Sequence, residues 1–146
     1  MTSIKLELFD ECIEDLTPLL ISYWGEADER RDSSSMDLGF DTYKQLEDLG
    51  LLHIITCREK TTVVGFVVFL LSQCTHTGKQ KACMEVLYVD AEYRGTGLAR
   101  SILDIAEKEI DADYFFCTLK TEFPHNNLVK ECGYSHVENV YMKEII

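Results

Sequence analysis

The sequence predicts a single α/β (α+β) domain, with a mixed central sheet of about seven strands flanked by about four helices. The first observation is length, because 146 residues suit one compact domain, which we expect to span residues 1–146. The second is composition: hydrophobic residues make up 46% and charged residues 27% of the chain, as in an ordinary folded protein. The third is the succession of hydropathy patterns, which runs in the order β-α-α-β-β-β-α-β-α-β-β.

The N-terminal patterns predict one strand and two helices. Residues 4–9 alternate apolar with polar side chains, which is the period of a half-buried strand. After Asp10, a plausible N-cap, apolar residues recur at helical spacing until Gly25, and residues 42–49 predict a second, shorter helix. The polar segment 26–37 between them is predicted to be an exposed loop.

The central patterns predict three consecutive strands. Residues 51–57 and 62–71 are rich in Ile, Val and Phe and are separated by a short charged turn, so they predict a hairpin of buried strands. Polar residues 73–80 make the next turn, and residues 82–90 predict the fourth strand.

The C-terminal patterns predict two helices and the remaining strands. Residues 98–110 carry apolar side chains on one face of a helix, and residues 114–119 predict a fifth strand. A short helix is predicted over residues 126–132, and residues 135–146 are strand-like.

Cysteine and histidine spacing predicts no metal site. The six cysteines are scattered without a C-x-x-C pair, and several lie in apolar runs, so we interpret them as reduced core thiols. The four histidines lack the i, i+4 spacing of a zinc-binding helix.

Charge and hydropathy predict a cytoplasmic protein that does not bind nucleic acid directly. The net charge of −12 disfavours a phosphate backbone as partner and favours a cationic ligand. Residues 1–50 hold most of this acidity, with 13 acidic side chains against 4 basic ones. The longest apolar stretch, residues 63–71, is too short to cross a bilayer, so we expect no membrane association.

A glycine-rich turn between the fourth strand and the helix at 98–110 predicts a phosphate site. Backbone N–H groups in an Arg-Gly-x-Gly turn, here Arg94 to Gly97, converge with the positive end of the helix dipole. A P-loop would need Lys and then Ser or Thr after Gly97, but Leu98 and Ala99 follow. A dinucleotide fingerprint would need glycine where Arg100 stands, and it belongs after the first strand of a βαβ unit.

The third phosphate-binding pattern matches at every fixed position. Residues 94–99, RGTGLA, satisfy [QR]-x-x-G-x-[GA], and residues 85–95, EVLYVDAEYRG, resemble the strand and loop that precede it in GNAT acyltransferases. The predicted order of strands and helices is also similar to the GNAT fold over nearly the whole chain. The resemblance implies acetyl-CoA as the acyl-donor substrate.

The resemblance also implies which residues bind the cofactor. In this family the backbone of the fourth strand pairs with the pantetheine arm, while the glycine loop and the helix start bind the pyrophosphate. The residues concerned are Leu87, Tyr88, Val89, Arg94, Gly95, Thr96, Gly97, Leu98, Ala99 and Arg100.

Glu85 is the candidate catalytic base. Acyl transfer to an amine needs a neutral nucleophile, so a group must take the proton from the ammonium, directly or through water. Strand alternation places Glu85 on the same face as Cys83 and Leu87, and glutamate at this place resembles the base of many GNAT enzymes. An ion-paired Glu85 without a catalytic role is the alternative. The resemblance further implies that a backbone N–H of the fourth strand, that of Val89, holds the oxyanion.

The general acid is not assigned. The tyrosine that protonates the thiolate in this family would stand at Val129, so the chain departs from the pattern. Tyr134 or Tyr141 could substitute, or the thiolate could be protonated by water. The family's cofactor-touching asparagine would correspond to Asn126 or Asn127 after an adjustment of the loop.

Two hypotheses of function follow. The first is an N-acetyltransferase that moves the acetyl group to a primary amine of a small molecule or protein by direct attack. Acidic residues of the first-helix region would attract the cationic acceptor; they are Glu26, Asp28, Glu29, Asp32 and Asp37. The alternative is a catalytically inactive acidic protein of this fold that binds a partner or host protein. Several segments, including residues 23–26 and 46–52, also resemble GNAT proteins of tailed bacteriophages, and this resemblance implies that the protein acts in the host cytoplasm. The apolar C-terminal strands favour a homodimer.

Overall fold

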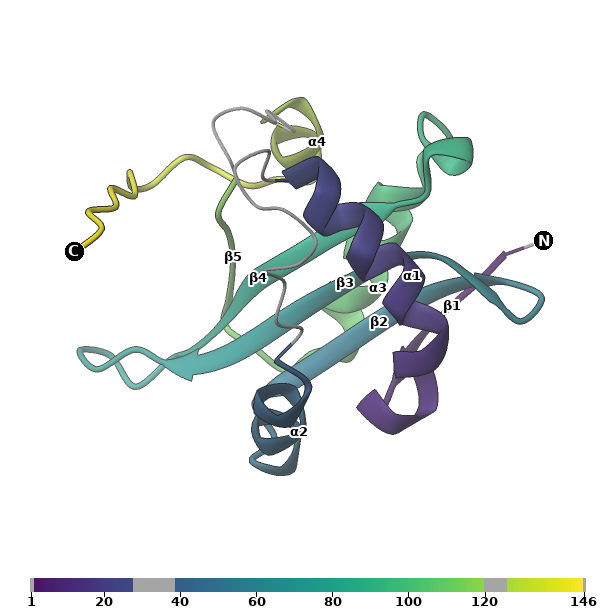
Figure 1. Cartoon of the computed structure of the whole chain (residues 1–146). Helices are drawn as coiled ribbons and strands as arrows, with labels where there is room; N and C mark the ends of the chain where they lie inside the picture. The colour runs from purple at the N-terminus through teal and green to yellow at the C-terminus, as the bar shows by residue number, and fades with distance from the viewer. Residues whose placement is uncertain (1, 28–38, 120–125, 146) are drawn as a thin grey trace.

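The chain folds into an α+β domain whose elements follow the predicted order over most of its length. The structure is a computed structural model that describes residues 2–27, 39–119 and 126–145. Figure 1 shows the elements, which in chain order are β1 (Thr2–Glu7), α1 (Phe9–Ala27), α2 (Phe40–Asp48), β2 (Leu52–Glu59), β3 (Thr62–Gln73), β4 (Gln80–Val89), the 3-10 helix η2 (Ala91–Tyr93), α3 (Leu98–Glu109), β5 (Tyr114–Cys117) and α4 (Asn126–Glu131).

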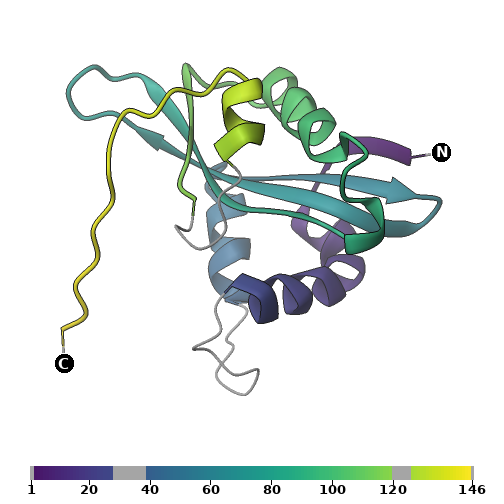
Figure 2. The ribbon, with the colours of Figure 1, turned by 90° about the horizontal axis from the view of Figure 1, so that it is seen from above.

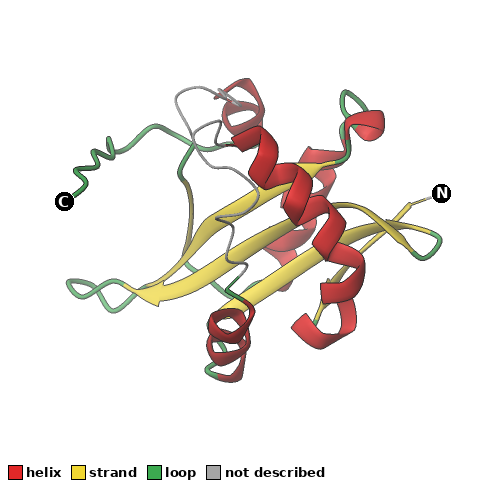
Figure 3. Cartoon of the chain, in the orientation of Figure 1, coloured by secondary structure: helices red, strands yellow, loops and turns green. Residues whose placement is uncertain are grey.

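The described strands form one mixed sheet of five strands in the order β1-β2-β3-β4-β5. The pairs β1–β2, β2–β3 and β3–β4 are antiparallel, and β4–β5 is parallel. A parallel pair needs a crossover, and α3 makes it between β4 and β5 (Figure 3).

Helices cover both faces of the sheet. Seen from above, α1 and α2 lie on one side of the sheet, and α3 and α4 lie on the other (Figure 2). Side chains alternate between the two faces, so β3 contributes Phe66 and Val68 to the core under α1, and Val67 and Phe69 to the core under α3. This arrangement leaves the C-terminal end of β4 between the two helix layers.

Gly65 lets α3 approach the sheet closely. A Cβ built on Gly65 would lie 3.0 Å from Cδ1 of Ile102 and 3.4 Å from the carbonyl oxygen of Tyr88. We therefore expect Gly65→Val to lower the free energy of unfolding by about 1–3 kcal/mol through overpacking. Thermal unfolding measures it, with Gly25→Ala as the control because nothing lies within 4 Å of that position. An unchanged melting temperature for Gly65→Val would contradict the prediction.

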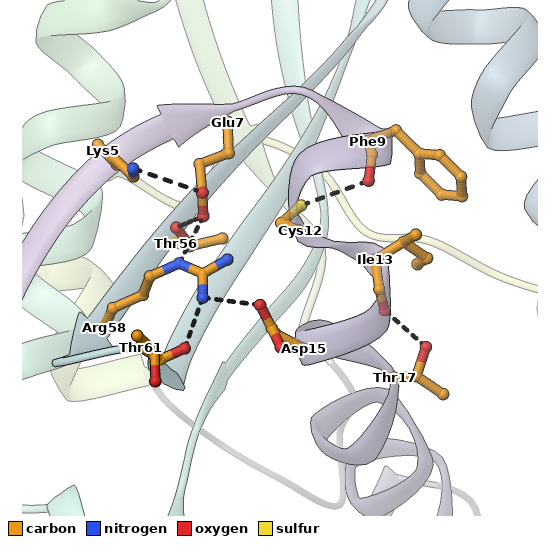
Figure 4. Close-up of polar contacts among 10 residues, drawn as sticks. All are labelled: Lys5, Glu7, Phe9, Cys12, Ile13, Asp15, Thr17, Thr56, Arg58 and Thr61. Carbon is orange, nitrogen blue, oxygen red and sulfur yellow. Dashed lines mark hydrogen bonds and ion pairs between the residues drawn. The ribbon is translucent and has the colours of Figure 1, made fainter.

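A buried carboxylate ties β1 to β2 beneath α1. The side chain of Glu7 is 4% exposed; it accepts a hydrogen bond from the Thr56 hydroxyl and pairs with Arg58 Nε at 3.1 Å (Figure 4). The same guanidinium reaches Asp15 of α1 at 2.9 Å and the carbonyl oxygen of Thr61 at 2.6 Å. Burial alone raises the pKa of Glu7, but the hydrogen bonds from Thr56 and Arg58 outweigh it and hold the pKa below its usual value.

The prediction of about seven strands is not confirmed. The fifth strand ends at Cys117 rather than at residue 119, and residues 135–145, predicted to be strand-like, form no strand. This segment runs away from the body of the domain, and its apolar side chains Val140, Tyr141 and Met142 are exposed (Figure 1). Apolar content alone therefore misled the prediction, because a strand also needs a neighbouring strand for its backbone hydrogen bonds.

Candidate acyl-donor site

The sheet opens along one edge of β4. The parallel pairing with β5 runs from Lys81↔Tyr114 to Met84↔Cys117 and ends there. β4 continues to Val89 and stays paired with β3, but among the described strands none pairs with its other edge beyond Met84.

The main chain of Leu87 and Val89 faces this open edge. The N–H of Asp90 donates to the carbonyl oxygen of Val64 on β3, at 2.9 Å. Residues of an antiparallel strand alternate the direction of their polar groups, so the N–H and C=O of Val89 and Leu87 point away from β3. Those of Tyr88 point toward β3. The main chains of Leu87 and Val89 thus face the side from which an added strand-like ligand would pair.

The loop after β4 forms a cradle of backbone N–H groups. Gly95 and Gly97 adopt φ of +79° and +83°, and no atom lies within 4 Å of a Cβ built at either position. The Thr96 hydroxyl donates to the carbonyl oxygen of Tyr93 at 2.6 Å, which fixes the turn.

The start of α3 completes the cradle. The first hydrogen bond of the helix is donated by Ser101 N–H to the carbonyl oxygen of Gly97, at 3.1 Å. The N–H groups of Leu98, Ala99 and Arg100 therefore have no carbonyl partner within the helix. Together with the helix dipole they form a site suited to a phosphate group, at the C-terminal end of the open β4 edge.

Arg94 lies at the joint between the open edge and the cradle. Its Nε donates to the carbonyl oxygen of Val89 at 2.9 Å, and its guanidinium lies 5.1 Å from the centre of the Tyr88 ring. Its terminal nitrogen pairs with Glu26 at 2.8 Å, and the Tyr88 hydroxyl donates to the other carboxylate oxygen at 2.8 Å. Burial opposes ionisation of Glu26, but the bonds from Tyr88 and Arg94 hold its pKa below the usual value. Sequence patterns did not reveal this contact between residues 68 positions apart.

Glu85 occupies a β-bulge in β4. The register shifts there, because Phe69 pairs with Met84 whereas Val68 pairs with Val86, and this leaves Glu85 as the extra residue. The bulge moves Leu87 to the α3 face, where it packs against the core. The prediction that Glu85 and Leu87 share a face is therefore wrong.

The bulge exposes Glu85 on the face of α1 and α2. Tyr43 of α2 packs on that face, and its pKa is raised by burial and also by the charge of Glu85. A carboxylate thus stands beside the open edge, on the face opposite α3.

The site combines a strand edge for a linear arm, an anion cradle at its end and a carboxylate beside it. The sequence profile of the acetyltransferase (GNAT) family matches residues 13–134, which include all three parts. The chain belongs to the acetyltransferase (GNAT) family.

Solved GNAT structures share this fold at low sequence identity. The chain is similar to a ribosomal-protein-alanine N-acetyltransferase from Brucella melitensis biovar Abortus 2308, with a TM-score of 0.77, 20% identity and coverage of 99% of both chains. It is also similar to an aminoglycoside acetyltransferase from an uncultured soil metagenomic sample, in complex with sisomicin, with a TM-score of 0.78, 12% identity and coverage of 99% of this chain and 95% of that one.

A third similar structure is glucosamine-6-phosphate N-acetyltransferase from Arabidopsis thaliana, with a TM-score of 0.72, 16% identity and coverage of 99% of this chain and 98% of that one. No curated protein matches the chain in sequence.

The position of the usual GNAT proton donor holds a buried side chain, since Val129 is 8% exposed. Tyr141 is 88% exposed in the C-terminal segment. The hydroxyl of Tyr134 is buried with no hydrogen-bond partner among the described residues, and burial raises its pKa. Asn126 and Asn127 begin α4.

Within residues 2–27, 39–119 and 126–145, no three His, Cys, Asp or Glu side chains are grouped as metal ligands would be. All six cysteines are free thiols, and Cys12 and Cys57 are buried. No described helix is long and apolar enough to cross a membrane. The acidic residues Asp28, Glu29, Asp32 and Asp37 lie outside the described residues.

Proposed function

We propose that this GNAT protein moves an acetyl group from acetyl-CoA to a primary amine by direct attack. The observation that carries the proposal is the continuity of the open β4 edge with the cradle at the start of α3. An extended arm paired with Leu87 and Val89 would end with its pyrophosphate at the N–H groups of Gly95 to Arg100. Acetyl-CoA has this layout, with a linear amide-containing arm followed by a pyrophosphate.

In this proposal two residues of β4 take part in the transfer. Glu85 takes a proton from the ammonium, directly or through water, because it is exposed beside the edge. The amine nitrogen then forms a bond to the thioester carbon, and the Val89 N–H stabilises the oxyanion. The C–S bond breaks, the amide nitrogen releases its remaining excess proton to solvent, and the leaving thiolate takes a proton from solvent, since a valine stands at position 129.

The acceptor is a cationic amine. The chain carries a net charge of −12, which attracts a cation and disfavours nucleic acid. The similar structures are named for acetylation of a ribosomal protein, an aminoglycoside and glucosamine-6-phosphate, so the fold accommodates small and macromolecular acceptors. The same proposal includes a bacteriophage source, a location in the host cytoplasm and a homodimer. It treats residues 1–146 as a single domain.

Calorimetric titration of the purified protein with acetyl-CoA tests the donor site. We expect a dissociation constant in the micromolar range, or about −8 kcal/mol. Binding would justify a screen of acceptors that begins with polyamines, aminoglycosides and lysine peptides. The release of free thiol from acetyl-CoA would measure the activity with each acceptor. A folded protein that binds no acetyl-CoA would refute the proposal.

Glu85→Gln is expected to lower kcat about 100-fold with the best acceptor of that screen, because an amide cannot take the proton. Acetyl-CoA affinity should be unchanged, since Glu85 faces away from the α3 side. Thiol release gives kcat, and Glu109→Gln at the exposed end of α3 is the matched control. A kcat within twofold of the wild type would leave Glu85 without a catalytic role.

One observation favours a second candidate, an inactive protein of this fold that acts by binding a partner. Val129 replaces the usual proton donor and is buried, so α4 presents no hydroxyl there. Acetyl-CoA binding without turnover of any amine in the screen would favour this candidate.

A further inference from the structure

The Arg94 side chain is directed away from the anion cradle. The guanidinium stacks on the ring of Tyr88, whose side chain packs in the core under α1 and α2. The cradle is formed with α3, and α3 covers the opposite face of the sheet (Figure 2). In the RGTGLA motif, therefore, the glycine backbone lies with α3 on one face of the sheet, and the arginine side chain lies on the face covered by α1 and α2.

The charge of Arg94 is already matched within the protein. Glu26 lies 2.8 Å from its terminal nitrogen and is held in place by the Tyr88 hydroxyl. The side chains of Arg94 and Glu26 are about half exposed, at 46% and 48%. The pair therefore contributes little to overall stability, and its removal should leave the fold intact.

The remaining contact of Arg94 is to the donor edge itself. Its Nε donates a hydrogen bond to the carbonyl oxygen of Val89, and this oxygen faces the open edge of β4. This leaves the N–H of Val89 and both main-chain groups of Leu87 for an incoming ligand. Because a guanidinium is planar and carries five donors, Arg94 can hold Val89 and Glu26 at the same time.

We propose that Arg94 is a positioning residue for the pantetheine arm rather than a ligand of the pyrophosphate, and that Glu26 acts through it. Arg94 caps the Val89 carbonyl and so fixes where strand-like pairing with the arm ends. Glu26 and Tyr88 hold the guanidinium in that place from α1 and β4. The inference rests on the proposed function, since it assumes that the donor is a coenzyme A thioester.

The test separates the two halves of the donor. Coenzyme A carries the arm and the pyrophosphate, whereas 3′-phosphoadenosine 5′-diphosphate carries two linked phosphates but no arm. We expect Arg94→Ala to weaken coenzyme A binding about 10-fold and to leave the affinity for the nucleotide within about twofold of the wild type. Calorimetry measures both, after thermal unfolding has shown that the variant is folded.

Glu26 should act only through Arg94. Glu26→Gln is expected to weaken coenzyme A binding about threefold, and to have no further effect in the Arg94→Ala background. Arg94→Lys should not restore affinity, because an ammonium group cannot reproduce the planar contacts to Val89 and Glu26. A merely structural role for Glu26 would not depend on Arg94 in this way.

Arg100→Ala is the matched control on the other face. Arg100 is exposed at the first turn of α3, so its loss should weaken both ligands by the same factor. If Arg94→Ala also weakens both ligands equally, Arg94 contacts the pyrophosphate and the inference is wrong; it is equally wrong if neither affinity changes. Failure of the wild type to bind coenzyme A would instead refute the proposed function, before any variant is compared.

Discussion

Gly97→Glu is expected to abolish acetyl-CoA binding, with a loss of about 1,000-fold or more in affinity, or roughly 4 kcal/mol. Gly97 has a φ of +83° and nothing within 4 Å of its missing Cβ, so a side chain would extend into open space at the proposed anion cradle. A glutamate there would also place a negative charge against the N–H groups of Leu98 and Ala99. Calorimetry with acetyl-CoA measures the loss.

Backbone strain has to be separated from the loss of the site. A non-glycine residue at positive φ costs about 1–2 kcal/mol wherever it stands. Gly50 offers a matched control, because its φ is +74° and its Cβ position is also open. It precedes β2, which begins at the other end of the sheet from the cradle. Gly50→Glu should lower stability by a similar amount and leave acetyl-CoA affinity unchanged. Equal binding by wild type and Gly97→Glu would place the pyrophosphate elsewhere.

The cradle was predictable from sequence because it is a local structure. Arg94 to Ala99 form one turn and one helix start, and the glycine spacing alone determines which backbone N–H groups can converge. The order of the main helices and strands was predictable for a similar reason, because burial of one face imposes a period on neighbouring residues.

The details of the site depended on contacts that the sequence does not encode locally. Residues Val86 to Val89 are all apolar, so their pattern could not reveal the bulge that separates Glu85 from the face of Leu87. The pairing of Arg94 with Glu26 joins α1 to the loop that follows η2, and no spacing rule predicts it. Glu26 was instead expected to attract the acceptor, together with the acidic residues that follow it.

The C-terminal segment shows the same limit for the fold. Its apolar residues predicted strands, yet residues 135–145 do not pair with the described sheet. Whether such a segment forms a strand is decided by the availability of a partner edge, which is a property of the assembled domain.

Replacing Arg58 with methionine is expected to lower the free energy of unfolding by about 3–5 kcal/mol at neutral pH. The change preserves much of the side chain's volume but leaves the Glu7 carboxylate, whose side chain is 4% exposed, without its main counter-charge (Figure 4). Lys5 would remain at 3.6 Å, but it is 58% exposed and compensates weakly. Urea denaturation at pH 7 measures the loss, and Arg100→Met is the control because Arg100 is exposed.

The pH dependence identifies Glu7 as the source of this loss. In the wild type the folded-state pKa of Glu7 lies below its usual value of 4.5, so its stabilising contribution is present above that pH and is lost as pH falls further. Without Arg58, burial should dominate and raise the folded-state pKa of Glu7, so the folded variant binds a proton more readily than the unfolded chain. The difference in stability between wild type and Arg58→Met should therefore shrink between pH 7 and pH 4.

A second substitution distinguishes an uncompensated charge from lost packing. Glu7→Gln removes the charge but keeps an oxygen that can accept the hydrogen bond from the Thr56 hydroxyl. The double variant Glu7→Gln with Arg58→Met should therefore be more stable than Arg58→Met alone, with a weaker dependence on pH, because no buried carboxylate remains to take up a proton. If the double variant is no more stable than Arg58→Met, the lost contacts of Arg58 with Asp15 and Thr61, rather than the charge of Glu7, account for the lower stability.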